Sequence, residues 1–387
     1  MSSFDTTSKS SIPIVDVSAL FHNSVGSDVH NATIAEIGKA CRNVGFFYVS
    51  NHNVTEELIK NLTLLSQAFF NQDVAIKNEI CMAKGGKAWR GFFPVGDEVT
   101  SGIPDQKEGI YFGSNLTSSD PRPLHGPNIY PENICLPGDK TWTMKYAVEK
   151  YMTAVQTLGA VLMQAIALSL GLDEHFFTEF FSQEPTTLFR IFNYPPHAAK
   201  FGDHSFGVGE HTDYGYITIL YQDHQGGLEV KNIESNTWTT APPVAGTFVI
   251  NLGDALEHMT GGLVRATPHR VRKREGATED RLSFPFFYDP NFDSEMFSIV
   301  DRLSPEDVAI AARNRQQQQK QSARGVIVNA NSSSNSNSNS SDASETAGGG
   351  GYRRWDCQEV TSYSGTYGSY LLRKVGKVFP DLASTAL

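Results

Sequence analysis

Two histidines and one aspartate carry the most specific chemical signal in this sequence. His211 and Asp213 lie two positions apart, so in an extended strand both side chains point to the same face. His269 lies much further along the chain and can join them only if the fold brings it back. Two imidazoles and one carboxylate leave up to three coordination positions of a metal open, as in the facial triad of non-haem iron(II) sites. A His-x-Asp pair alone is more often structural, so this predicted metal centre depends on the rest of the pattern.

Arg281 and Ser283 follow His269 with the same two-residue spacing, which places a guanidinium and a hydroxyl on one side of a strand. The planar guanidinium of arginine binds a carboxylate through two hydrogen bonds. The pair therefore suits the distal carboxylate of a 2-oxo acid whose other end chelates the metal. Taken alone, Arg281 would be interpreted as a surface salt bridge. Together with the three metal candidates, it favours a carboxylate site.

Short strands separated by turn residues must position these side chains. A period of two, typical of strands, recurs between glycine, proline and asparagine, and several such segments in succession predict a sandwich, jelly roll or barrel. The expected strands are 188–193, 216–221, 227–230, 247–251, 269–272 and 282–288. Before them, helical spacing of apolar residues predicts helices at 31–44, 56–70 and 144–170, and residues 12–16 read as an edge strand because Pro13 cannot donate to a central ladder.

The segment from 313 to 351 differs in composition from the rest of the chain. It contains QQQQ, an Asn/Ser run and GGGG, which bury too little apolar surface to offset the entropy of ordering. The expected organisation is a disordered tail at 1–11, an N-terminal region at 12–135, a long helix with the catalytic core at 136–312, a disordered insertion at 313–351, and a C-terminal helical segment at 352–387.

Composition excludes several classes of protein. With 387 residues, 40% hydrophobic and 19% charged, the chain can bury a large core in one catalytic domain. The formal net charge of -10 argues against nucleic-acid binding. Neither a secretory signal nor a long uninterrupted apolar stretch is evident, and the four dispersed cysteines read as reduced thiols. We therefore expect a cytoplasmic monomer that binds neither nucleic acid nor membranes.

Blocks of sequence along nearly the whole chain resemble the isopenicillin N synthase-like family of iron(II), 2-oxoglutarate-dependent dioxygenases. They occur in the family's order, and only the 313–351 insertion is foreign. The blocks are IPIVDVS, CRNVGFFYVSNHNV, LFRIFNYPP, GEHTDYGYITIL, QGGLEV, PPVAGTFVINLGDALEHMTGG, RATPHRV and RLSFPFFYDPNFD.

The resemblance implies a mainly β fold with flanking helices, a distorted double-stranded β-helix or jelly roll. It implies iron ligands at His211, Asp213 and His269, and a 2-oxoglutarate carboxylate site at Arg281 and Ser283. Tyr194 matches a family tyrosine that contacts the co-substrate. The implied cofactors are Fe(2+), 2-oxoglutarate and dioxygen, with ascorbate as a reductant. The implied reaction hydroxylates, desaturates or cyclises a small organic molecule while releasing succinate and carbon dioxide.

Three other functions stay open at this point. The first is an iron oxidase of the same fold that works without 2-oxoglutarate, as isopenicillin N synthase and the plant ethylene-forming oxidase do, and an Arg-x-Ser pair occurs there too. An ethylene- and succinate-forming enzyme is a related variant. The second is a zinc hydrolase, although no HExxH segment is present. The third is a non-catalytic binding protein.

The sequence leaves the substrate undefined. Arg90 and Lys107 lie in segments that resemble the family's active-site mouth and could contact an anionic substrate, although we expect them to be surface charges. His52, His204, His224 and His258 match no family ligand position, so we expect structural or surface roles for them.

Overall fold

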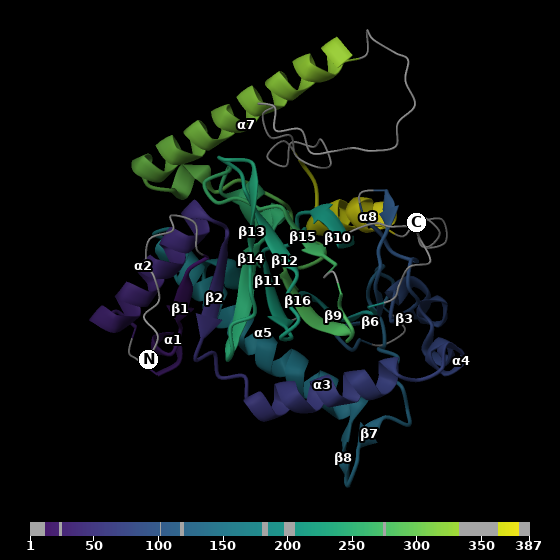
Figure 1. The fold of residues 1–387 in the computed structure, drawn as a ribbon. Helices are drawn as coiled ribbons and strands as arrows, with labels where there is room; N and C mark the ends of the chain where they lie inside the picture. The colour runs from purple at the N-terminus through teal and green to yellow at the C-terminus, as the bar shows by residue number, and fades with distance from the viewer. Residues whose placement is uncertain are drawn as a thin grey trace.

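The computed structural model describes residues 12–22, 25–100, 102–116, 120–179, 185–196, 206–273, 276–332 and 363–378. The expected disordered tail at 1–11 and His204 lie outside these ranges. Figure 1 shows two β-sheets with helices on the outside of the larger one.

The larger sheet has eight strands in the order β1-β2-β14-β11-β16-β9-β6-β3. β1 pairs with β2 in parallel at one edge, as Pro13 led us to expect, and the other pairings are antiparallel. Its strands are β1 (Ile14–Asp16), β2 (Phe46–Ser50), β14 (Thr247–Leu252), β11 (Ile217–Gln222), β16 (Arg281–Asp289), β9 (Thr186–Tyr194), β6 (Glu108–Gly113) and β3 (Gly91–Phe93).

The smaller sheet has four strands in the order β10-β15-β12-β13. They are β10 (Phe206–His211), β15 (His269–Arg272), β12 (Leu228–Asn232) and β13 (Thr237–Thr240). A buried cluster joins the two sheets, with Phe46 and Val249 from the larger sheet against Val208, Val230 and Val271 from the smaller one. Two sheets that are antiparallel apart from the β1–β2 edge enclose a shared interior and form the expected jelly roll.

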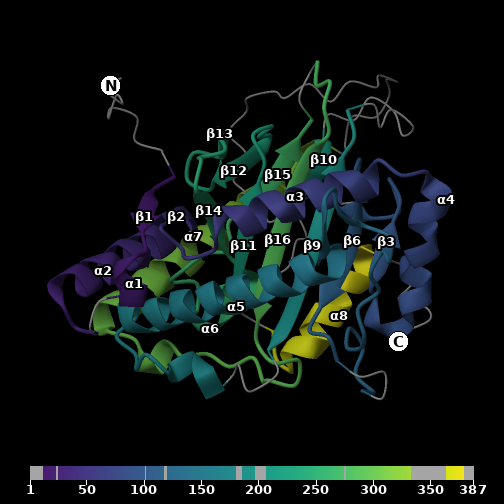
Figure 2. The ribbon, with the colours of Figure 1, turned by 90° about the horizontal axis from the view of Figure 1, so that it is seen from below.

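Helices cover the outer face of the larger sheet, where α5 (Met144–Ser169) and α3 (Glu56–Phe70) lie across the strands and α2 (Asp28–Asn43) packs beside α5 (Figure 2). The Thr143 hydroxyl caps α5 by accepting from the backbone N–H of Tyr146 at 3.1 Å. Among the described residues, α5 alone is long and apolar enough to cross a membrane. Half of its most apolar 18-residue stretch is buried inside the fold. A helix in the core of a globular fold can have the same length and apolar composition.

The remaining elements are short or peripheral. They are α1 (Ala19–His22), α4 (Val74–Lys77), η1 (Asn78–Ile80), η2 (Met82–Ala88), β4 (Val99–Thr100), β5 (Ile103–Pro104), β7 (Cys135–Leu136), β8 (Asp139–Thr143), η3 (Phe176–Glu179), α6 (Asp254–Met259), η5 (Val300–Arg302), α7 (Pro305–Ser332) and α8 (Tyr367–Val378).

The prediction that residues 313–351 form a disordered insertion was wrong for the first part of this segment. Residues 313–332 continue α7 and lengthen a helix that begins at Pro305. Alanine, arginine and glutamine have high helix propensity, so a polar segment attached to an existing helix can extend it without burying a core face. α7 projects beyond the sheets in Figure 1. The rest of the expected insertion, 333–351, lies outside the described residues.

Candidate active site

The fold brings the three predicted metal ligands together at one wall of a cavity. β10 and β15 pair so that His211 and His269 are direct cross-strand partners, and Asp213 lies two residues past the end of β10. The Nε2 atoms of His211 and His269 lie 3.9 and 3.8 Å from the carboxylate oxygens of Asp213. One ligand atom from each residue lies within 4.8 Å of the others. Among the described residues, no other group of this kind is found.

Both imidazoles are held with Nε2 facing the cavity. The Nδ1 atoms lie 2.9 Å from the carbonyl oxygen of Gly209 and 3.2 Å from that of Thr267. Because a carbonyl oxygen can only accept, Nδ1 carries the proton in each ring and Nε2 keeps its lone pair for a metal.

Protonation also favours metal binding. Burial lowers the pKa of His211, and burial together with the neighbouring His211 lowers that of His269 to about 4. Burial alone would raise the pKa of Asp213, but the two histidines and hydrogen bonds from Thr218 and Asn251 outweigh it and lower this pKa. At neutral pH the site thus offers two neutral imidazoles and one carboxylate.

Two further side chains orient Asp213, and no motif in the sequence marks them. The Thr218 hydroxyl and the Asn251 amide donate to Oδ2 of Asp213 at 2.5 and 2.7 Å. Thr218 faces the cavity from β11 and Asn251 from the adjacent strand β14. Partners of this kind fix the orientation of a ligating carboxylate and strengthen metal binding.

The predicted co-substrate residues lie further along the same cavity. Arg281 and Tyr194 are cross-strand partners, and the guanidinium lies 4.7 Å from the centre of the tyrosine ring. Arg281 donates from Nε to the carbonyl oxygen of Gly226 at 2.5 Å, whereas its buried Nη1 has no hydrogen-bond partner among the described residues. Ser283 lines the cavity on the same strand. A buried arginine nitrogen without an acceptor fits a carboxylate ligand.

Comparison with known proteins gives the family. Residues 12–133 match the family model for the N-terminal region of non-haem dioxygenases in morphine synthesis. Residues 185–290 match the model of the 2OG-Fe(II) oxygenase superfamily. A probable iron/ascorbate oxidoreductase of Dictyostelium discoideum is 38% identical over 97% of this chain and 97% of its own length. The chain belongs to the 2OG-Fe(II) oxygenase superfamily. It is a 2-oxoglutarate-dependent non-haem iron dioxygenase, as its sequence blocks led us to expect.

Two other members of the superfamily illustrate its range. The 1-aminocyclopropane-1-carboxylate oxidase of Dictyostelium discoideum is 32% identical over 96% of this chain and 95% of its own length. The solved structure of Neurospora crassa T7H with alpha-KG is 26% identical, with a TM-score of 0.65 over 76% of this chain and 90% of that one.

In this dioxygenase the cavity has a volume of about 370 Å³, and two neighbouring strands build much of its wall. Every second residue of each strand faces inward, as the pleat of a strand requires. β9 contributes Leu188, Arg190, Phe192 and Tyr194, and β16 contributes Arg281, Ser283, Pro285, Phe287 and Asp289. Leu371 and Val375 of α8 close part of the opposite side.

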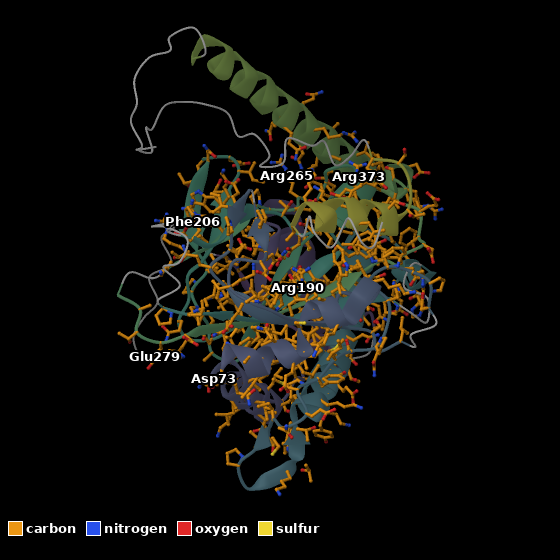
Figure 3. The ribbon with its side chains drawn as sticks, turned by 90° about the vertical axis from the view of Figure 1, so that its right-hand side faces the viewer. Asp73, Arg190, Phe206, Arg265, Glu279 and Arg373 are labelled. Atoms are coloured by element: carbon orange, nitrogen blue, oxygen red, sulfur yellow. The ribbon has the colours of Figure 1, made fainter. Side chains whose placement is uncertain are left out.

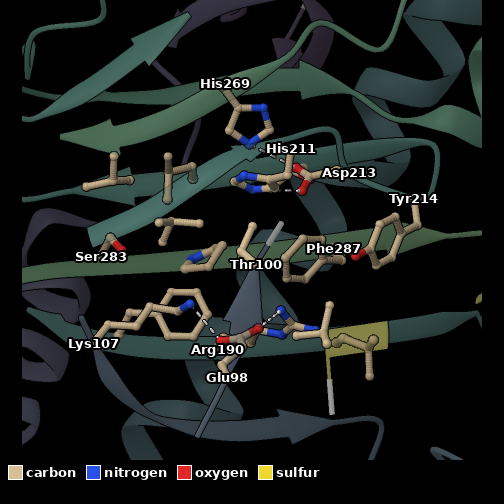
Figure 4. A pocket seen from close by; sticks show the side chains of 18 of the residues that line it. Glu98, Thr100, Lys107, Arg190, His211, Asp213, Tyr214, His269, Ser283 and Phe287 are labelled. Atoms are coloured by element: carbon tan, nitrogen blue, oxygen red, sulfur yellow. Dashed lines mark hydrogen bonds and ion pairs between the residues drawn. The ribbon is translucent and has the colours of Figure 1, made fainter. Parts of the chain in front are cut away.

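A buried cluster of charges in this cavity was not predicted. Lys107 is 1% exposed and forms ion pairs with Glu98, at 2.7 Å, and with Asp105, so its expected role as a surface charge was wrong. Arg190 Nη1 lies 3.6 Å from Glu98. Figure 4 shows Lys107, Glu98 and Arg190 across the cavity from the metal-ligand candidates.

The other predicted candidates lie elsewhere. Arg90 is also buried, but it donates to the carbonyl oxygens of Ala88 and Leu124 and does not line the cavity. His52 packs edge-on against Phe248, and His258 is buried. His224 is exposed beside Glu279.

Proposed function

We propose that this dioxygenase oxidises a small organic molecule, with hydroxylation as the default outcome and desaturation or ring closure as variants. His211, Asp213 and His269 would hold iron(II), and Arg281, Ser283 and Tyr194 would bind 2-oxoglutarate. One observation carries the assignment: the three ligand candidates and the buried, unpartnered Nη1 of Arg281 face the same cavity. The site thus offers a facial metal position and a carboxylate anchor together.

The side chains of this chain bind and orient, and none acts as a strong acid or base. Bound iron(II) would supply the oxygen chemistry that couples decarboxylation of 2-oxoglutarate to substrate oxidation. Arg281 and Ser283 hold the distal carboxylate, which fixes where the 2-oxo end reaches the triad. Thr218 and Asn251 both donate to Oδ2 of Asp213 and so hold its carboxylate in the orientation in which it would bind the metal.

A second candidate is an iron oxidase that works without 2-oxoglutarate. The similarity to a 1-aminocyclopropane-1-carboxylate oxidase over 96% of the chain favours it. An Arg-x-Ser pair does not separate the two reactions, so the co-substrate must be tested directly.

The deciding experiment is an anaerobic absorption titration of the purified protein with iron(II) and then with 2-oxoglutarate. We expect the weak charge-transfer band of a chelated 2-oxo acid, and loss of the band in His269→Ala. Iron binding without the band would favour the direct oxidase. Failure to bind iron would overturn both candidates.

We predict that Arg281→Ala raises the 2-oxoglutarate concentration needed for half-maximal succinate release by about tenfold or more, because a charge-assisted carboxylate contact is lost. Arg272→Ala, which changes a more exposed arginine paired with Glu229, is the matched control. An unaltered 2-oxoglutarate requirement in Arg281→Ala would remove Arg281 from the co-substrate site.

We further propose that the enzyme works in the cytoplasm as a monomer, without nucleic-acid or membrane partners. The net charge of -10 supports this, as do the unpaired thiols of Cys41, Cys81 and Cys135. Cell fractionation and light scattering of the purified protein test the two parts.

A further inference from the structure

Arg190 is a second arginine that lines the cavity, and it belongs to neither the proposed iron site nor the proposed co-substrate site. It lies on β9 four residues before Tyr194 and faces the same cavity. At about 3.3 Å per residue, this places it roughly 13 Å along the strand from the position that pairs with Arg281. The two guanidiniums therefore serve opposite ends of the cavity.

The Arg190 side chain faces the cavity, is 15% exposed, and has one long ion pair, with Glu98. No hydrogen bond to it is found among the described residues, and its buried Nε has no partner. Its nearest carboxylate, Glu98, lies 3.6 Å away. Arginine has five N–H donors in a planar fork, and such donors are rarely left unused inside a protein. The arrangement leaves Arg190 able to bind an added acceptor.

The surroundings hold this guanidinium in place. It lies 4.2 Å from the ring centre of Tyr111 and 4.8 Å from that of Phe287. Glu98 also accepts from the Tyr111 hydroxyl at 2.8 Å and pairs with Lys107. The two rings and the ion pair fix the plane of the guanidinium before any ligand arrives.

The nearby carboxylates Glu98 and Asp105 are already engaged, and Asp289, which also lines the cavity, accepts from the Tyr367 hydroxyl at 2.7 Å. Glu98 is shared by Tyr111, Lys107 and Arg190, and Asp105 by Lys107 and Thr100. An incoming ammonium would have to displace one of these partners, whereas an incoming carboxylate can use the unused donors of Arg190. The balance favours an anionic substrate group over a cationic one.

Apolar side chains contribute much of the lining near Arg190, together with Asp289 and Lys377. Val99 and Phe287 line this end of the cavity, and Leu371, Val375 and Val378 of α8 close it. We propose, building on the proposed function, that the substrate is a carboxylic acid with an apolar body, whose carboxylate binds Arg190. Figure 4 shows Arg190 across the cavity from His211, Asp213 and His269, so the oxidised carbon lies away from the carboxylate.

Carboxylic acids and their uncharged analogues test this proposal. The probes are hexanoate, phenylacetate and the primary amides of both, added to the anaerobic complex of the full chain with iron(II) and 2-oxoglutarate. Binding is measured by the change in the charge-transfer band and by the melting temperature of the protein. We expect the acids to bind at least about tenfold more tightly than the amides, the usual effect of a charge-assisted hydrogen bond.

Variants then assign that preference to Arg190. Arg190→Gln should lose the preference for acids while its 2-oxoglutarate titration stays unchanged, and Arg190→Lys should retain part of it. Arg373→Gln, which changes an exposed arginine of α8, should behave as the wild type. Equal binding of acids and amides, no binding of either acid, or a preserved preference in Arg190→Gln would overturn the proposal.

The outcome stays separate from that of the proposed function. If the wild type shows no charge-transfer band with iron(II) and 2-oxoglutarate, that result counts against the 2-oxoglutarate site alone. The melting temperature still compares acids with amides in that case, because it needs no iron chromophore.

Discussion

At the scale of single residues, Asn251 shows how a side chain that does not touch the metal can control it. Its amide and the Thr218 hydroxyl both donate to Oδ2 of Asp213. The carboxylate is thereby held in one orientation, with Oδ1 3.9 Å from Nε2 of His211 and Oδ2 3.8 Å from Nε2 of His269. The predicted metal centre depends on this orientation as well as on the three ligands.

We predict that Asn251→Ala lowers the affinity for iron(II) by roughly 10- to 100-fold, the usual effect of removing such a partner, while the fold is retained. Anaerobic equilibrium titration measures this affinity, and Asn71→Ala at the end of α3 is an exposed control. Unchanged iron affinity would mean that Thr218 alone orients Asp213.

Asp289 makes a second residue-scale prediction, on pH. Burial raises the pKa of this carboxyl to about 7, and its Oδ2 accepts from the Tyr367 hydroxyl at 2.7 Å. Because the folded pKa lies above the ordinary value of 3.8 for an aspartate, the folded apoprotein binds an extra proton between these two pH values. Its free energy of unfolding should therefore decrease as pH rises from about 4 to about 7.

Asp289→Asn should remove this part of the pH dependence and should not be less stable than the wild type above pH 7. At about 1.36 kcal/mol per pKa unit, the effect is a few kcal/mol. Urea unfolding at a series of pH values measures it. Parallel curves for the two proteins would show that Asp289 is ionised in the folded state throughout.

At the scale of elements, α8 is fastened to the core by buried polar contacts as well as by its apolar side chains. The Tyr370 hydroxyl donates to Asp254 at 2.6 Å, and Lys374 lies 3.6 Å from the same carboxylate. The same helix brings Leu371 and Val375 to the cavity. The position of α8 therefore sets the shape of the substrate end.

We predict that Tyr370→Phe lowers the free energy of unfolding by about 1–3 kcal/mol, since a buried carboxylate loses a donor. It should also expose α8 to limited proteolysis. Tyr146→Phe, at an exposed tyrosine, should have no effect. A Tyr370→Phe protein as stable and as resistant as the wild type would show that apolar packing alone holds α8.

Elements with a clear period were predictable from the sequence, and irregular ones were not. The helix expected at 56–70 matches α3, and strands β9, β11 and β16 lie where alternation placed them. β6 was missed because all its residues are buried, so no alternation marks it. The helical part of the 313–351 segment was missed because its polar composition resembles that of disordered chains, although its residues can extend a helix that begins earlier, at Pro305.

The candidate site divides in the same way. The two-residue spacing of His211 and Asp213, and of Arg281 and Ser283, predicted that each pair faces one side, and both pairs line the cavity. His269 has no such spacing, and only the fold brings it to the same cavity. Arg190 lies four residues before Tyr194 on the same strand. Side chains alternate between the two faces of a strand, so the sequence predicts that both point to the same face. Lys107 could not be predicted in this way, because its burial depends on ion pairs with Glu98 and Asp105.

At the scale of the whole molecule, the site joins the two sheets. His211 and His269 come from the smaller sheet, while Arg281 and Ser283 come from the larger one. Ligands that bind both walls stabilise the folded state as a unit, by about 2.7 kcal/mol at a hundredfold excess over the dissociation constant.

We therefore predict that iron(II) and 2-oxoglutarate together raise the melting temperature by a few degrees under anaerobic conditions. Asp213→Ala should abolish the part due to iron. If the two ligands leave the melting temperature of the wild type unchanged, they do not bridge the sheets.

The cavity is assembled from separate stretches of chain. Glu98 and Lys107 lie between β3 and the start of β6, whereas the predicted iron and 2-oxoglutarate residues all fall between 194 and 283. The stretch that holds Glu98 and Lys107 can therefore change in sequence without changing the iron and 2-oxoglutarate residues. Replacing residues 94–107 with the corresponding stretch of a relative should change the ion pairs that hold Arg190, and with them the preferred substrate, while the iron and 2-oxoglutarate residues stay intact.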